Sequence, residues 1–347
     1  MGLLRNMLAG VAGLAAWQAS TAGAETVTVA AYSGIFQDHY TKAVIDPFME
    51  ANPDITVEFY GMANSAQMLG TLRAQKASPQ VDVVIMDVSV AKAASDEGLL
   101  DPVDESVSSH VADLYPAARH EGVAGVGVTF DNLVLLHNTE QVPEAPDSWT
   151  ALWNEQYAGK IAIPAVPDIQ GITFTIILNH MEGGEDYLQS VDAGIEKLAE
   201  LAPLVQTWDP HPDVYAPVVS GQLAMAIGWN ARAQVYSEES GGRLGVVLPK
   251  EGSGFQINTI NLVKNAPSSE AAKRFIDYAL SPEAQRAFTE AMFYAPTNSK
   301  AEVPSAVADR TAAGSMDRMI DIDWIEVAKI RDAVTEQWRR RVIPLSR

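Results

Sequence analysis

The chain has 347 residues, of which 47% are hydrophobic and 20% are charged, and its formal net charge is −20. This length and balance suit one large or two medium folded domains and exclude an intrinsically disordered chain. The absence of cysteine excludes disulfides, thiolate metal sites, thiol nucleophiles and a lipid-modified N-terminal cysteine. The negative charge repels nucleic acid and anionic lipid, so we expect neither as a partner.

The first 24 residues have the layout of a secretory signal peptide. Arg5 supplies a positive start, residues 7–17 form an uncharged run of apolar and small side chains, and Ala22-Gly23-Ala24 is a small-x-small cleavage site. We therefore expect the mature chain to begin at Glu25. Because no later stretch has 18 consecutive apolar residues, we also expect a soluble, secreted protein in the periplasm.

Strands and helices alternate at the start of the mature chain. The spacing of apolar side chains predicts strands over residues 26–31, 55–60 and 81–86. Helices are predicted over residues 36–48 and 91–97, and a third helix runs from Asn64 or Ser65 to Gln75. The third strand is nearly all apolar and ends at Asp87. Because such a strand is buried on both faces, the pattern predicts an α/β fold with a mostly parallel sheet flanked by helices.

A short polar interruption indicates a change of lobe. Asp131-Asn132 separates an expected strand over residues 122–128 from one over residues 133–137, with almost no loop between them. Further strands are expected over residues 160–163, 224–229, 244–248 and 255–263. Three further helices are expected to start at Ser148, near Gly171 and at Ser281-Pro282. Two more are expected over residues 271–280, with Ser269 as the cap, and over residues 321–341. We predict an N-terminal lobe of residues 25–130 and 258–300 and a C-terminal lobe of residues 131–257 and 301–347, joined by short hinge strands.

Local signatures of catalysis are missing. The chain has no phosphate-binding loop, no dinucleotide-binding glycine fingerprint and no G-x-S-x-G turn, and its six histidines form no H-E-x-x-H pair. These observations favour binding over catalysis, and we expect no enzymatic activity, no cofactor and no metal. A secreted enzyme whose site lacks a local signature remains the alternative.

Four segments resemble a known family. They are residues 147–160 (DSWTALWNEQYAGK), 220–231 (SGQLAMAIGWNA), 248–252 (LPKEG), and 271–283 (AAKRFIDYALSPE) followed by 294–298 (YAPTN). Together they are similar to the extracellular solute-binding proteins of ABC importers, in the spermidine/putrescine-binding group, over about residues 27–301. The resemblance implies a type II periplasmic-binding fold of two lobes, a ligand cleft that closes between them, and permease subunits in the inner membrane as partners. We expect a monomer.

Polar residues that follow strands are the first candidates for ligand contacts, because ligands of open α/β sheets bind at the carboxyl ends of strands. Tyr32, Ser33 and Gly34 follow the first strand, Asn64 follows the second, and Asp87 follows the third. Each of these positions is equally suited to capping the next helix. The resemblance adds a loop that matches a cleft region of the family, with Gln170, Gly171 and Thr173.

A second group of candidates combines tryptophan and charge. It consists of Trp208, Asp209, Trp229, Asn230 and Arg232. A tryptophan face can pack against alkyl carbons or a cation, and an arginine can bind a carboxylate or phosphonate through two parallel hydrogen bonds. The alternatives are core packing for Trp229 and a surface or interlobe salt bridge for Arg232.

Gln256 and Asn258 bear on the class of ligand. Polyamine binders of the family carry Trp and Asp in the stretch that here reads Phe255-Gln256-Ile257-Asn258-Thr259, and no clear counterpart of their acidic residue occurs near Gln170. A neutral amide does not offset the desolvation of a buried cation as a carboxylate does. We therefore expect a zwitterionic or anionic ligand, such as an amino-acid derivative, an opine or an aminophosphonate. Polyamine binding and presentation of the ligand to a periplasmic sensor remain alternatives.

Overall fold

The computed structural model describes residues 24–211 and 213–346. The predicted signal peptide therefore lies outside the described residues, apart from Ala24. The strands are β1 (Glu25–Tyr32), β2 (Ile55–Met62), β3 (Val83–Asp87), β4 (Leu100–Asp101), β5 (Val126–Asn138), β6 (Ile161–Ala162), β7 (Val205–Thr207), β8 (Met225–Trp229), β9 (Leu244–Val247), β10 (Ser253–Val263) and β11 (Met319–Ile320).

The α-helices are α1 (Ile35–Tyr40), α2 (Asp46–Ala51), α3 (Ser65–Ala74), α4 (Val88–Asp96), α5 (Ile169–Met181), α6 (Asp192–Leu201), α7 (Tyr215–Val219), α8 (Asn230–Glu239), α9 (Ser269–Ala279), α10 (Pro282–Met292), α11 (Ser305–Ala308) and α12 (Trp324–Gln337). π-helical turns η1 (Thr41–Ile45) and η8 (Trp338–Val342) join α1 to α2 and extend α12. The 3-10 helices are η2 (Ser109–Asp113), η3 (Pro116–Ala118), η4 (Trp149–Trp153), η5 (Glu155–Tyr157), η6 (Ala202–Leu204), η7 (Ala312–Arg318) and η9 (Ile343–Leu345). No helix of the described residues is long and apolar enough to cross a bilayer.

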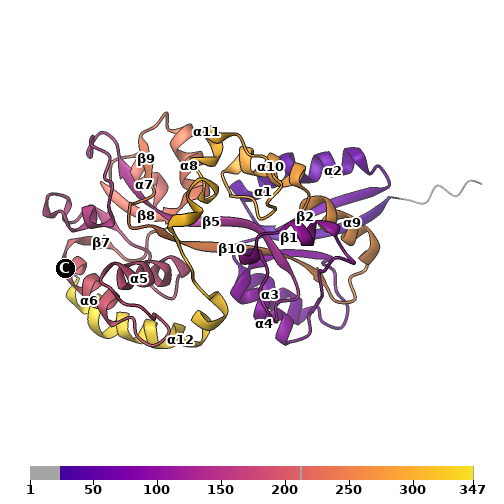
Figure 1. The fold of residues 1–347 in the computed structure, drawn as a ribbon, viewed down its shortest axis with the longest axis horizontal. Helices are drawn as coiled ribbons and strands as arrows, with labels where there is room; N and C mark the ends of the chain where they lie inside the picture. The colour runs from indigo at the N-terminus through magenta and orange to yellow at the C-terminus, as the bar shows by residue number, and fades with distance from the viewer. Residues whose placement is uncertain (1–23, 212, 347) are drawn as a thin grey trace, which may run out of the picture.

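The strands form one 11-stranded sheet in the order β2-β1-β3-β10-β5-β8-β6-β7, with β4, β9 and β11 added at its sides. β1, β2 and β3 are parallel and β10 runs antiparallel to β3. β6, β7 and β8 repeat this arrangement, with β5 antiparallel to β8. We call β2, β1, β3 and β10 the first half of the sheet, and β7, β6, β8 and β5 the second half. In Figure 1 the two halves lie side by side, and β5 and β10 run between them.

The mostly parallel sheet flanked by helices confirms the predicted fold class. β3 is buried along its whole length, as its apolar sequence requires. Helix α9 buries Ala272, Phe275, Ile276 and Ala279 on one face, as their helical spacing predicts. The predicted lobe boundaries fall within β5 and β10, and they remain a prediction.

Three local predictions were wrong. Asp131 and Asn132 do not separate two strands, because β5 is continuous and hydrogen-bonds to β10 before residue 133 and to β8 from residue 133 on. Ser268, not Ser269, precedes α9, and its side chain makes no capping bond. The last helix begins at Trp324 rather than residue 321, because the Asp323 carboxylate accepts the amides of residues 325 and 326 and so defines the helix start.

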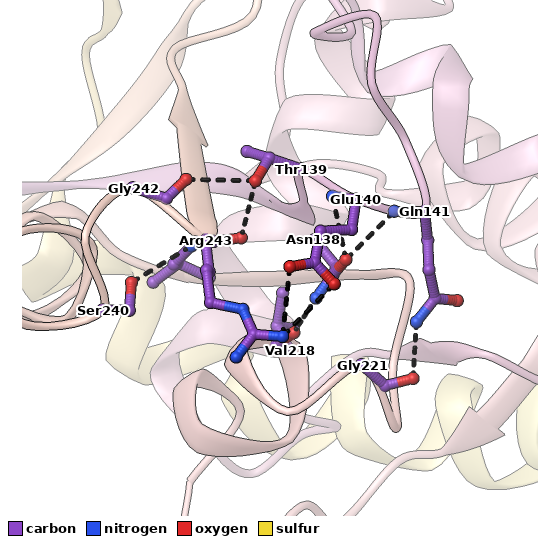
Figure 2. A network of polar contacts seen from close by, with 10 residues as sticks. Asn138, Thr139, Glu140, Gln141, Val218, Gly221, Ser240, Gly242 and Arg243 are labelled. Atoms are coloured by element: carbon purple, nitrogen blue, oxygen red, sulfur yellow. Dashed lines mark hydrogen bonds and ion pairs between the residues drawn. The ribbon is translucent and has the colours of Figure 1, made fainter.

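The far end of β5 is fixed to the second half by side-chain hydrogen bonds (Figure 2). Asn138 Nδ2 donates to the Val218 carbonyl at 2.8 Å, and Gln141 Nε2 donates to the Gly221 carbonyl at 2.5 Å. The Thr139 hydroxyl lies within hydrogen-bonding distance of the Gly242 carbonyl, at 3.1 Å. β5 is therefore anchored at residue 138, and its middle, near residue 131, lies where the two halves meet.

Candidate ligand-binding site

The carboxyl ends of the parallel strands converge where the two halves meet. β1 ends at Tyr32, β3 at Asp87 and β8 at Trp229. In the ladder Asp87 lies opposite Asn258 of β10, and Trp229 lies opposite Leu133 of β5. Open α/β sheets bind ligands at such strand ends, so the fold indicates a site at this junction.

A hydrogen-bonded chain of side chains lines the first half of the junction. The Tyr32 hydroxyl lies 2.8 Å from Ser65 Oγ and donates to Asn258 Oδ1 at 2.9 Å. Asn258 Nδ2 in turn donates to Thr129 Oγ1 at 3.0 Å, and Asn258 is 0% exposed. Burial, reinforced by the charge of Asp87, raises the pKa of the Tyr32 phenol. Both ends of the Asn258 amide are therefore engaged within the protein, and Asn258 orients Tyr32.

Asp87 combines the two roles considered for it. Its Oδ1 accepts the Ser89 amide at 2.9 Å and the Ser89 hydroxyl at 2.6 Å, which caps α4. Its Oδ2 is buried and has no hydrogen-bond partner among the described residues. Burial raises the pKa of the carboxyl, while the Ser89 bonds and the nearby Arg331 guanidinium oppose that effect. Asp87 thus caps a helix with one oxygen and keeps the other available to a donor.

Ser33, Gly34 and Asn64 lie at the exposed rim of the first half. Gly34 precedes α1 with a φ of 74°, a backbone conformation that favours glycine. Ser33 donates its amide to the Met62 carbonyl at 2.9 Å, and Asn64 Oδ1 caps α3 by accepting the Gln67 amide. Backbone geometry and helix capping therefore account for the presence of these three residues at the rim.

A cavity of about 260 Å³ opens on the second half of the junction. We call it the strand-end cavity, and it is lined by Pro164, Ala165, Asp168, Gln170, Trp208, Asp209, Pro210, His211, Asp213, Val214, Tyr215, Trp229 and Arg232. The structure thus brings together Gln170, Trp208, Asp209, Trp229 and Arg232, which the sequence placed in three separate segments. The sequence analysis missed Asp168, although it lies two residues before Gln170.

Arg232 is the free cation of this cavity. It is half-buried, and its side chain makes no hydrogen bond or ion pair within the described residues. Burial lowers the pKa of its guanidinium, but Tyr215, Tyr294 and Asp213 around it raise the pKa by more. The predicted alternative, a salt bridge, is not formed in the described part of the chain, so the guanidinium is open to an anionic group.

Tyr215 fixes the tryptophan beside Arg232. Its hydroxyl accepts the Trp229 amide at 2.9 Å and lies 3.2 Å from the Trp229 carbonyl. The Tyr215 ring stacks on Tyr236 with centroids 5.1 Å apart. Trp229 is partly buried and packs against the hydrophobic cluster of the second half while lining the cavity. Core packing and ligand contact are therefore compatible for Trp229.

Asp131 is an acidic residue of the junction that the sequence analysis read only as a strand break. Its Oδ1 accepts the amides of Asn132 at 2.8 Å and Ala231 at 3.0 Å. Its Oδ2 is buried without a partner among the described residues. Burial raises the pKa of the carboxyl to about 7, although those amides and Arg232 counteract the rise. An acid between two mostly apolar stretches, residues 126–130 and 133–136, is the signal that could have identified it.

Tyr294 connects the two sides of the junction. Burial raises the pKa of its phenol well above the ordinary value, Asp131 adds to the rise, and Arg232 opposes it. Tyr32 of the first half and Tyr215 of the second half act on the same phenol. The Tyr294 ring itself packs against Phe36 and Phe288.

The remaining candidates differ in how much of their side chain is available. Gln170 keeps a buried, unpartnered Oε1, and Gln256 is half-buried on β10 opposite Asp131. Gly171 has no room for a side chain, because an added Cβ would lie 2.6 Å from the Val166 amide nitrogen. Thr173 is 0% exposed and donates to the Ile169 carbonyl. Gly171 and Thr173 are thus explained by the packing of α5.

Three further candidates are held by other partners. Asn230 donates to the Arg310 carbonyl at 2.8 Å and accepts from Gln234, so both ends of its side-chain amide are engaged within the protein. Trp208 donates from Nε1 to Ser346 Oγ at 2.6 Å while its ring lines the cavity. Asp209 is exposed and lies 2.8 Å from His211 Nε2. Of these three, Trp208 and Asp209 still face the strand-end cavity.

The junction combines one unpaired cation with several buried acceptors. Arg232 offers a guanidinium without a partner, and Asp87, Asp131 and Gln170 each offer a buried oxygen without a donor. A buried acceptor left without a donor costs about 1–3 kcal/mol, so a ligand that supplies donors there is stabilised.

Comparison with known proteins identifies the family. The family model described as bacterial extracellular solute-binding protein matches residues 43–314. The chain belongs to this family. It is the substrate-binding component of an ABC transporter, which confirms the resemblance found in the sequence, and the family implies a small-molecule ligand and permease subunits as partners.

Relatives and solved structures agree with that assignment. The gamma-aminobutyric acid-binding protein of Pseudomonas aeruginosa is 24% identical over 351 residues, which cover 95% of this chain and 95% of that protein. The spermidine/putrescine-binding periplasmic protein of Escherichia coli K12 is 21% identical over 280 residues, covering 75% of this chain and 77% of that protein. A crystal structure of an ABC transporter substrate-binding protein from Bradyrhizobium japonicum has a TM-score of 0.78 at 21% identity, covering 91% of this chain and 98% of that one. The predicted type II periplasmic-binding fold is confirmed.

Proposed function

We propose that this protein captures a zwitterionic organic solute at the junction of its two halves and delivers it, chemically unchanged, to an ABC importer. The favoured ligands are amino-acid derivatives, opines and aminophosphonates. The observation that carries the proposal is the unpaired, half-buried guanidinium of Arg232 beside the buried, unpartnered Asp131 Oδ2.

Each charge of such a ligand meets a suitable group. A guanidinium binds a carboxylate or phosphonate through two parallel hydrogen bonds, and Arg232 has no competing partner in the described chain. Asp131 and Asp87 offer carboxylate oxygens to the ammonium group, and Trp208 and Trp229 line the cavity with aromatic surface for its carbon chain. The name of the gamma-aminobutyric acid-binding relative, which states a zwitterionic ligand, supports the same class.

Capture takes place by hinge closure. The N-terminal lobe comprises residues 25–130 and 258–300, the C-terminal lobe comprises residues 131–257 and 301–347, and β5 and β10 carry the hinge. Ligand contacts from both lobes favour the closed form, because a ligand shifts such an equilibrium only by its difference in affinity for the two forms. The mature protein, released from its signal peptide at Glu25, acts in the periplasm as a monomer.

Polyamine binding is the second candidate. Asp168 lines the strand-end cavity and Asp87 ends β3 with a buried, unpartnered Oδ2, and these two carboxylates support a diamine as the alternative ligand. The spermidine/putrescine-binding relative has a name that fits this candidate.

A thermal-shift panel separates the candidates. The mature protein is tested with 4-aminobutyrate, opines, aminophosphonates, α-amino acids, putrescine and spermidine. A ligand at a hundred times its dissociation constant stabilises the folded state by about 2.7 kcal/mol, so its effect on the melting temperature is easily measured. Stabilisation by a zwitterion, with the ligand recovered unchanged by NMR, supports the proposal. Stabilisation by putrescine or spermidine alone contradicts it.

A further inference from the structure

Helix α8 carries Arg232 and a polar stripe on opposite faces. Asn230, Gln234 and Glu238 are spaced four residues apart, so they lie along one face of the helix. Arg232 lies two residues after Asn230, or about 200° around the helix axis. Asn230 and Gln234 line a cavity of about 360 Å³, and none of its described lining residues belongs to the strand-end cavity, where Arg232 lies. Contacts to the stripe therefore lie behind the helix, away from the proposed site.

Arg310 bonds to every residue of this stripe. It lies two residues after α11, and its carbonyl accepts Asn230 Nδ2 at 2.8 Å. Its guanidinium donates from Nε to Gln234 Oε1 at 2.9 Å and from Nη1 to Glu238 Oε1 at 2.7 Å. Gln234 Nε2 donates in turn to Asn230 Oδ1 at 3.0 Å. We call these four residues the α8 clamp, which extends over about two turns of the helix.

An aromatic ring of the first half supports the Arg310 side chain. Arg310 Cζ lies 4.1 Å from the ring centroid of Phe293, a distance at which a cation is attracted to the face of the ring. Phe293 follows α10, is 4% exposed, and belongs to the hydrophobic cluster that includes residues of β1, β2 and β3. Figure 1 shows α8, α10 and α11 close together at one edge of the molecule, and α8 and α10 are in contact. The guanidinium is therefore held between a ring packed on the first half and the stripe of α8 in the second half.

Arg232 depends on α8 for its position. Its guanidinium has no hydrogen bond or ion pair within the described residues. Two backbone amides where the helix begins are bonded to Asp131 Oδ1 and to the Tyr215 hydroxyl, and these bonds locate its first turn. The α8 clamp extends to the last turn of the helix and so fixes its direction. If α8 changed direction, Arg232 would move with it, because no bond of its own side chain would oppose the movement.

We propose that Arg310 is a positioning residue of the binding site, which holds the guanidinium of Arg232 at the strand-end cavity through the α8 clamp. Arg310 lies behind the helix and is not among the described residues that line this cavity. The inference rests on the proposed function, in which Arg232 binds the acid group of the ligand. It also gives Asn230 a role, which is to hold the helix rather than to touch the ligand.

A double-mutant cycle tests this role. Calorimetric titrations with 4-aminobutyrate compare the wild type, Arg310→Met, Arg232→Ala and the double variant. Methionine keeps much of the apolar length of the arginine side chain but makes neither of the guanidinium bonds. We expect Arg310→Met to weaken binding about tenfold in the wild-type background and less than about twofold in the Arg232→Ala background. The second effect is small because a residue that acts only through Arg232 has no effect once Arg232 is absent.

Two further variants separate positioning from a general effect on the fold. Arg310→Lys keeps a cation but has one nitrogen in place of the fork that bonds Gln234 and Glu238 together, so its affinity should lie between those of the wild type and Arg310→Met. It takes the place of Arg310→Met in the cycle if a melting curve shows that the methionine variant is unfolded. Arg286→Met is the matched control, because Arg286 forms an exposed ion pair with Glu290 within α10, and its affinity should equal that of the wild type.

The outcomes distinguish this inference from the proposed function. If the wild type binds 4-aminobutyrate but Arg310→Met weakens binding equally in both backgrounds, or no more than Arg286→Met does, the role of Arg310 is disproved and the proposed function stands. If the wild type binds no zwitterion, the proposed ligand class fails, and crystal structures of the ligand-free wild type and Arg310→Met decide the role of Arg310. A guanidinium of Arg232 displaced from the strand-end cavity in the variant supports the role, and an unchanged position overturns it.

Discussion

The two halves of the sheet share one strand order but present different chemistry at their strand ends. In the first half, β1 ends in the Tyr32 hydroxyl, which hydrogen-bonds to Ser65 and Asn258, and β3 ends in the Asp87 carboxylate, which accepts from Ser89. In the second half, Trp229 ends β8 and is followed by Arg232, whose guanidinium has no partner in the described chain. The first half therefore offers an ammonium group the acceptor of Asp87, the second half offers an acid group the cation of Arg232, and Asp131 adds a further acceptor on β5, where the halves meet. A ligand held between them would be oriented by this difference.

Loss of the cation in the second half should have the largest effect on the affinity for the ligand. Arg232→Ala should weaken binding of the best zwitterion by about a hundredfold, or about 2.8 kcal/mol, because the ligand's acid group would lose a bidentate partner in a partly desolvated site. Isothermal titration calorimetry measures the change. Arg243→Ala is the control, because Arg243 lies in the same half at the far end of β5, where it pairs with Glu140 (Figure 2). An affinity equal to that of the wild type would remove Arg232 from the site.

The acid at the boundary between the halves should give a pH-dependent effect. Burial holds the pKa of Asp131 at about 7, whereas in an unfolded chain an aspartate titrates at about 3.9. The folded state therefore retains a proton that the unfolded state releases. Because of this difference, the contribution of Asp131 to the free energy of unfolding decreases as the pH rises from about 4 to about 7.

Asp131→Asn should remove that contribution. We expect the ligand-free variant to exceed the wild type in free energy of unfolding by about 4 kcal/mol more at pH 8 than at pH 4. Urea denaturation at both pH values measures this difference. Asp147→Asn, at an exposed acid paired with Lys250, should show no such change with pH. A pH-independent difference between Asp131→Asn and the wild type would show that Asp131 is ionised in the folded state over this whole range.

The sequence predicted the parts of the site that depend on local order along the chain. Tyr32, Asp87, Trp229 and Arg232 all follow apolar strands, and parallel strands bring their carboxyl ends to one edge of a sheet. That reasoning needs no knowledge of tertiary contacts. Gln170 came from the family resemblance instead, which gave no sign of the packing that requires glycine at position 171.

Other residues could not be predicted, because their roles depend on distant partners. Asn258 was weighed as a ligand contact, yet both ends of its amide bond to Tyr32 and Thr129, which are remote in sequence. In the sequence Asp131 looks like a strand break. Its buried environment cannot be read there, because it is formed in part by the start of α8, which is remote in sequence.

The smallest expected effect tests whether the division of charge between the halves is real. Asp209 lines the strand-end cavity in the second half, but it is exposed and lies 2.8 Å from His211 Nε2. Exposed ion pairs contribute at most about 1 kcal/mol, so Asp209→Asn should change the affinity for the zwitterion by less than about fivefold by calorimetry. A tenfold loss would mean that the second half also holds the ammonium group. The ligand would then lie within that half alone, and the acceptors of Asp87 and Asp131 would serve closure of the halves rather than orientation of the ligand.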